Sequence, residues 1–116
     1  IDGVPARACL TYALQADGAD VRTVEGLAAP DGTLSPLQAA FRRNHALQCG
    51  FCTAGILMML DAWLKDNPTP SEQEIREALS GNLCRCTGYE HIVRAVSEAL
   101  SERLGSTATG SAPNAG

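Results

Sequence analysis

Two close pairs of cysteines constrain this chain more than any other feature of its sequence. Two residues separate Cys49 from Cys52, one residue separates Cys84 from Cys86, and residues 53–83 contain no further cysteine. Two such pairs, brought together by the fold, would form one site with four thiolates. Thiolate ligands favour zinc, copper(I) or iron–sulfur, so we expect a metal centre where two loops of the chain meet.

The use of cysteine favours a metal over a disulfide framework. The chain contains five cysteines, and its first residues, Ile1-Asp2-Gly3, lack the basic and apolar regions of a secretory signal. This combination is typical of a reducing compartment, so we expect a cytoplasmic protein. A Cys-x-Cys disulfide would also close a very tight ring with poor geometry.

Composition argues against two kinds of partner. The formal net charge is −4, whereas binding to nucleic-acid phosphates requires clustered lysine and arginine. The sequence also contains no apolar run of about 18 residues that could span a membrane. Hydrophobic residues make up 45% of the chain but aromatic residues only 4%, so we expect an aliphatic core, which suits packed helices.

Residues 1–30 differ from the rest of the chain. Asp17-Gly18 is a turn signal, and residues 21–24 alternate with the period of a strand. Two short strands are not stable without a partner sheet. We therefore predict that residues 1–30 are the C-terminal remnant of a β-rich domain.

Residues 31–104 are predicted to form a domain of four helices. Ser35 with Gln38, and Ser71 with Glu74, have the spacing of capping boxes. A second helix is expected after Cys52 and a fourth from about residue 89 to 104, so each cysteine pair precedes a helix. The buried face is predicted to contain Leu37, Ala40, Phe41, Ile56, Leu57, Leu60, Trp63, Leu64, Ile75, Ala78, Leu79, Val93, Val96, Leu100 and Leu104.

Each cysteine pair is expected to lie near the N-terminus of a helix. A helix N-terminus carries unpaired N–H groups and a partial positive charge, both of which stabilise thiolates.

Residues 105–116 are rich in Gly, Ser, Thr and Ala, and we predict that they form a disordered tail.

Cysteine spacing alone leaves the metal open. Structural zinc sites usually pair loops with wider spacing than Cys-x-Cys, and the common ferredoxin spacings also differ from this one. A thiol–disulfide enzyme would use Cys49 and Cys52, but it requires a βαβ context that the sequence lacks.

The residues around both pairs resemble a known family. Residues 48–55, Gln-Cys-Gly-Phe-Cys-Thr-Ala-Gly, and residues 81–89, Gly-Asn-Leu-Cys-Arg-Cys-Thr-Gly-Tyr, are similar to the two signatures of the iron–sulfur small subunit of molybdenum hydroxylases. This family includes xanthine dehydrogenase, aldehyde oxidoreductase and aerobic carbon monoxide dehydrogenase. The resemblance runs from Gly3 to about Leu100. Ala54 departs from the usual proline, a change that the first turn of a helix tolerates.

The resemblance implies a subunit with two [2Fe–2S] clusters. A β-grasp, ferredoxin-like domain would hold one cluster and a four-helix bundle the other, so residues 1–30 would be the terminal strands of the first domain. The ligands of the bundle cluster would be Cys49, Cys52, Cys84 and Cys86. Cys9 would be the last ligand of the ferredoxin-type cluster, with its partner cysteines upstream of Ile1, so most of that domain would be missing.

The resemblance also implies a function. The chain would be the non-catalytic electron-transfer subunit of a molybdenum-containing oxidoreductase, passing electrons from molybdopterin on a large subunit toward FAD on a medium subunit. Gln48 would contact the pterin by hydrogen bonding and Cys86 through its sulfur. The alternative that remains open is a structural zinc module with four cysteine ligands, mediating protein contacts.

Overall fold

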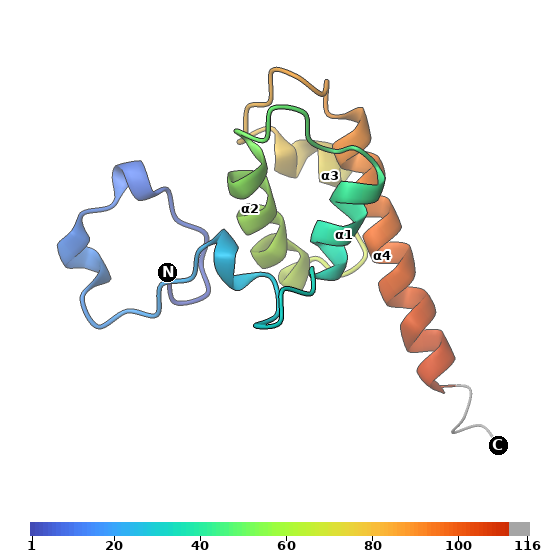
Figure 1. Cartoon of the computed structure of the whole chain (residues 1–116), viewed down its shortest axis with the longest axis horizontal. Coiled ribbons are helices and arrows are strands. Elements are labelled where there is room, and N and C mark those ends of the chain that lie inside the picture. Colours follow the sequence, from blue (N-terminus) through green and yellow to red (C-terminus); the bar gives the residue numbers. More distant parts are fainter. Residues whose placement is uncertain (112–116) are drawn as a thin grey trace.

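The chain folds into four helices that form one bundle (Figure 1). The structure is a computed structural model and describes residues 1–111. The helices are α1 (Pro36–Arg43), α2 (Thr53–Asp66), α3 (Glu72–Leu79) and α4 (Glu90–Ser111). The prediction of a mainly helical chain with four helices is confirmed. None of the helices in the described part combines the length and apolar character needed to cross a bilayer.

α4 organises the bundle by packing against both α1 and α3, while α2 packs against α1 and the short turn Val24–Gly26. The interior is aliphatic apart from one aromatic ring, as the composition indicated. Its largest fully buried side chains are Phe41, Ile56, Leu60, Ile75, Leu79, Ile92 and Val96.

Most of the predicted core positions are buried, but Leu104 is not. Trp63, Ala78 and Leu100 are half-buried, whereas Leu104 is 53% exposed. The prediction for Leu104 is wrong because α4 projects past the other three helices, as Figure 1 shows at its red end. Helical spacing indicates which face of a helix is apolar but not how far its neighbours extend.

Two helices begin at the capping boxes that the sequence predicted. The amide of Gln38 donates to Ser35 Oγ at 3.3 Å, and the amide of Ser35 donates to Gln38 Oε1 at 2.9 Å. Ser71 and Glu74 repeat the arrangement at α3, with distances of 3.3 and 2.7 Å. In each box, two backbone amides at or just before the start of the helix gain a hydrogen-bond acceptor.

The C-terminal part of the chain differs from the prediction. Residues 105–116 were expected to be disordered, but α4 continues to Ser111. Extending an existing helix adds one hydrogen bond per residue without a new nucleus, so weak helix formers can follow a stable segment. The remainder of the predicted tail, residues 112–116, lies outside the described residues.

The N-terminal segment contains no strand within the described residues. Its only regular elements are one-turn 3₁₀ helices at Ala8–Leu10, Ala13–Ala16 and Val24–Gly26, so residues 21–24 do not form the expected strand. A strand needs a neighbour to pair its backbone groups. The segment, blue in Figure 1, lies beside the bundle.

One side-chain contact ties this segment to the cysteine end of the bundle. Arg7 donates from Nη2 to the carbonyl of Gly81 at 2.6 Å, just before the second cysteine pair. The predicted domain boundary at residue 30 stays a prediction, although Leu27 is buried in the helical core and Val24 packs against it.

Candidate metal centre

The first cysteine loop leaves α1 through a tight C-terminal turn. The amide of Ala46 donates to the carbonyl of Phe41 at 2.9 Å, and His45 adopts a left-handed conformation with φ of 52°. This is the pattern of a Schellman motif, in which glycine usually takes the left-handed position. Ala46 is buried, so the chain is fixed to the core shortly before Gln48 and Cys49.

Cys49 and Cys52 lie on a turn that leads directly into α2. Gly50 has φ of 79°, a conformation that favours glycine, and the amide of Thr53 donates to its carbonyl at 3.3 Å. Cys52 is the N-cap residue of α2. The first pair therefore lies at a helix N-terminus, as predicted, where the partial positive charge stabilises thiolates.

Tyr89 holds the second cysteine loop in place. Its hydroxyl accepts a hydrogen bond from the amide of Cys84 at 2.7 Å and donates to the carbonyl of Asn82 at 3.1 Å. Gly88 and Tyr89 both have left-handed backbones, with φ of 66° and 70°. The loop therefore folds back on itself immediately before α4, and the tyrosine ring fixes the backbone that carries Cys84.

The fold brings the four cysteines together as two pairs, each with one member from each loop. The Sγ atoms of Cys86 and Cys49 are 3.5 Å apart. The thiols of Cys52 and Cys84 also lie close enough for each to shift the pKa of the other. Each of these pairs joins the two loops, so the predicted meeting of the loops is observed.

The protonation preferences follow the same pairing. The backbone N–H of Phe51 lowers the pKa of Cys49, whereas the hydrogen bond to Cys49 raises the pKa of Cys86. Burial raises the pKa of Cys52. Burial also opposes ionisation of Cys84, but hydrogen bonds from the Thr87 hydroxyl and from backbone amides lower its pKa to about 7. Each pair thus has one thiol that ionises readily, the form that binds metal.

This arrangement fits a centre with two metal ions. A tetrahedral ion with metal–sulfur bonds of about 2.3 Å holds two thiolates roughly 3.8 Å apart, close to the separation of Cys49 and Cys86. A [2Fe–2S] cluster takes four thiolates on two irons, whereas a single zinc needs all four around itself.

A buried hydroxyl beside the first loop supports the same fit. Among the described residues, Thr53 Oγ1 is buried without a hydrogen-bond partner. Buried polar atoms are rarely left unpaired, and Thr53 follows Cys52 directly in the chain. The hydroxyl acts on the neighbouring Cys52 thiol, whose pKa it lowers, so Cys52 as a thiolate ligand would give it an acceptor.

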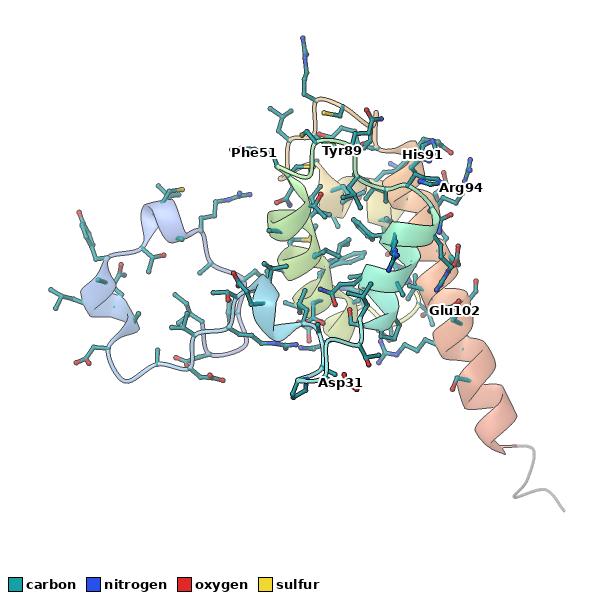
Figure 2. The ribbon with its side chains drawn as sticks, in the orientation of Figure 1. Asp31, Phe51, Tyr89, His91, Arg94 and Glu102 are labelled. Atoms are coloured by element: carbon teal, nitrogen blue, oxygen red, sulfur yellow. The ribbon has the colours of Figure 1, made fainter. Side chains whose placement is uncertain are left out.

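The two cysteine pairs differ in their exposure. Cys84 is only 8% exposed and Cys52 is half-buried, whereas Cys49 and Cys86 are exposed. One pair is therefore part of the core and the other lies at the surface. Apolar side chains stand beside them: Phe51 is 96% exposed and Leu83 is 85% exposed. Figure 2 shows Phe51 and Tyr89 at the same end of the bundle.

Two other predicted site residues lie outside this group. Gln48 is exposed next to Cys49, and its side chain makes no hydrogen bond within the described chain. Cys9 is exposed in the first 3₁₀ turn, which Figure 1 shows to the side of the helices. The structure brings no other cysteine of the described residues into contact with Cys9.

Sequence reasoning missed the side-chain roles of Thr87 and Tyr89. Both lie within three residues of Cys86, and this proximity was the only available signal. The Nδ1 of His91, on α4, lies 2.8 Å from the carbonyl of Asn44, where α1 ends. It therefore links the start of α4 to the first cysteine loop.

Comparison with known proteins agrees with this geometry. A family described as "[2Fe-2S] binding domain" matches residues 23–97. These residues include both cysteine loops and almost all of the buried core.

Relatives with similar sequences are subunits of oxidoreductases. The nicotine 6-hydroxylase small subunit of Paenarthrobacter nicotinovorans is 62% identical over 99 residues, covering 85% of this chain and 59% of that subunit. Caffeine dehydrogenase subunit gamma of Pseudomonas sp. strain CBB1 is 56% identical over 98 residues, covering 82% and 58%. The chain thus spans less than two thirds of the length of either relative.

A solved structure shows the same fold. Quinoline 2-oxidoreductase from Pseudomonas putida 86 aligns with a TM-score of 0.82 and 56% identity, over 87% of this chain and 62% of that chain. The aldehyde oxidoreductase of Desulfovibrio gigas aligns with a TM-score of 0.81 and 39% identity, over 90% of this chain and 12% of that one.

Proposed function

Because this chain belongs to the [2Fe-2S] binding domain family, we propose that it is the electron-transfer subunit of a molybdenum hydroxylase. The carrying observation is the arrangement of its cysteines as two pairs, each shared between the two loops. A [2Fe–2S] cluster bound there supplies one-electron transfer. In such a site, Cys49 and Cys86 would hold one iron, and Cys52 and Cys84 would hold the other.

The chain's own residues give the two sides of the site different tasks. Cys84 and Cys52 anchor one side in the core, where burial excludes water. Cys49 and Cys86 leave the other side accessible to a partner, which suits a site that must exchange electrons across an interface. The exposed apolar side chains of Phe51 and Leu83 would be covered by the same partner.

The partners proposed for the whole protein are a large subunit with molybdopterin and a medium subunit with FAD. Gln48 and Cys86 are both exposed, as contact with a pterin on another subunit requires. Replacing Gln48 by alanine should leave the visible spectrum unchanged but slow reduction of the chain by the substrate of the complex. Unchanged reduction kinetics would remove Gln48 from the contact.

Further parts of the proposal concern the N-terminal segment and the substrate. Residues 1–30 would complete a β-grasp domain, with Cys9 as a ligand of a second cluster, in a cytoplasmic complex. Relatives are named for nicotine, caffeine and quinoline, which are all nitrogen heterocycles. We therefore propose that the complex oxidises a substrate of this class, in a pocket outside this chain.

The test is a measurement of iron, acid-labile sulfide and zinc in the purified protein, with EPR after reduction by dithionite. The proposal expects about two irons and two sulfides for each four-cysteine site, and a signal from a one-electron-reduced cluster. Iron beyond the capacity of this site would support a role for Cys9. Zinc in place of iron, without an EPR signal, would overturn electron transfer and favour the structural module.

A further inference from the structure

The Thr87 hydroxyl contacts the sulfur of one of the proposed iron ligands. Its Oγ1 lies 3.1 Å from Cys84 Sγ and also 3.1 Å from the backbone nitrogen of Tyr89. Thr87 is half-buried and Cys84 is buried, so water competes little for either contact.

The two contacts together set the direction of the hydroxyl proton. A backbone N–H can only donate, so Thr87 Oγ1 accepts the hydrogen bond from Tyr89. The hydroxyl has one proton of its own, which is left free to point at Cys84 Sγ. A thiolate can only accept, so with Cys84 ionised the contact is an O–H···S hydrogen bond.

The loop is built to hold this orientation. Tyr89 has a left-handed backbone with φ of 70°, a conformation that disfavours residues other than glycine. The tyrosine hydroxyl binds the amide of Cys84 and the carbonyl of Asn82, and these bonds offset the strain. Tyr89 therefore holds the backbone of Cys84 through its side-chain hydroxyl and the hydroxyl of Thr87 through its backbone amide.

We propose that Thr87 raises the reduction potential of the cluster through a hydrogen bond to the Cys84 thiolate. This inference rests on the proposed function. Reduction adds one electron to the iron–sulfur core, and no proton leaves Thr87, so the site gains one negative charge. A donor aimed at a ligand sulfur stabilises that added charge, and hydrogen bonds to sulfur are among the factors that set the potentials of such clusters.

The test compares two substitutions in the purified protein by redox titration monitored by EPR. Thr87→Val keeps the shape but removes the hydroxyl, whereas Thr87→Ser keeps the hydroxyl. At a fixed poise, the ratio of reduced to oxidised cluster should fall about tenfold in Thr87→Val, which equals about 59 mV for one electron. Thr87→Ser should stay close to the wild type, as should the control Thr69→Val, since Thr69 is exposed outside the cysteine loops.

The outcomes separate this inference from the proposed function. Wild-type protein without iron overturns both, whereas normal iron with an unshifted Thr87→Val overturns the inference alone. Equal shifts in Thr87→Val and Thr87→Ser also overturn it, because loop packing would then be responsible. If Thr87→Val fails to hold iron, Thr87→Ala replaces it. If Thr87→Val and Thr87→Ala both lose iron but Thr87→Ser keeps it, the result supports a role for the hydroxyl at Cys84. If all three variants lose iron, the inference is overturned.

Discussion

The two phenylalanines of this chain lie in opposite environments. Phe41, on α1, is 1% exposed and packs in the centre of the bundle, whereas Phe51, between two cysteines of the first loop, is 96% exposed. The two positions are ten residues apart in the sequence. The first region shows the packing of an ordinary core, whereas the second leaves an aromatic ring almost entirely in solvent.

Stability and function are distributed differently in this domain. Stability follows burial, which is concentrated between α1, α2, α3 and α4. The proposed function requires residues on both sides of that division, because one cysteine pair belongs to the core and the other to the surface. Substitutions in matched residues from the two regions can therefore test the comparison.

The largest effect is expected at the cysteines, where burial should make no difference. Cys84→Ser and Cys86→Ser should each abolish nearly all cluster binding, because each removes a ligand from one of the two pairs. Visible absorption and iron content of the purified variants measure this. If the variant at the exposed Cys86 kept its iron, the outer pair would not be part of the site.

The phenylalanines should differ strongly in stability. Phe41→Ala should lower the free energy of unfolding by about 3–5 kcal/mol, because it leaves a cavity in the core. Phe51→Ala should change it by less than about 0.5 kcal/mol, as expected for an exposed position. Urea denaturation of the loaded protein measures both. A large loss in Phe51→Ala would show that its ring packs within the domain.

How far the sequence predicts this structure depends on the range of the interactions involved. The capping boxes at Ser35 and Ser71 and the apolar helix faces depend on residues a few positions apart, and these predictions are confirmed. The extent of α4 and the exposure of Leu104 depend on where other helices end, and helical periodicity does not contain that information.

The site shows the same division. Cysteine spacing and the helix N-terminus at Cys52 predicted that the two loops meet. The pairing of Cys49 with Cys86, and the return of the Thr87 hydroxyl to Cys84, depend on left-handed residues in the loops. Gly50 and Gly88 hint at such turns, but nothing in the sequence marks Tyr89 as left-handed.

The two tyrosines offer a smaller test at the level of hydrogen bonds. Tyr89→Phe should lower the free energy of unfolding by about 1–2 kcal/mol, since it leaves the amide of Cys84 and the carbonyl of Asn82 without their partner. Tyr12→Phe, on an exposed ring of the N-terminal segment, is the matched control and should have little effect. Equal denaturation midpoints for the two variants would mean that water replaces the Tyr89 hydroxyl.

The smallest effect is expected at the ion pairs between Arg43, at the end of α1, and Glu98 and Glu102 on α4. Hydrogen bonds from Asn44 and Arg43 lower the pKa of Glu98 below its usual range. A carboxyl group with a lower pKa in the folded state stabilises the fold above its unfolded pKa. That contribution is lost as the pH falls through the folded pKa.

Glu98→Gln should therefore reduce stability slightly at neutral pH and make no difference in acid, where the wild-type carboxyl is protonated. Because the pair is largely solvated, the difference should be small and should shrink further with salt. Thermal melting of both proteins between neutral and acidic pH measures it. If the difference in melting temperature between the two proteins stayed constant across this pH range, Glu98 would stabilise the fold by packing rather than by its charge. Stability on this face would then also follow burial alone.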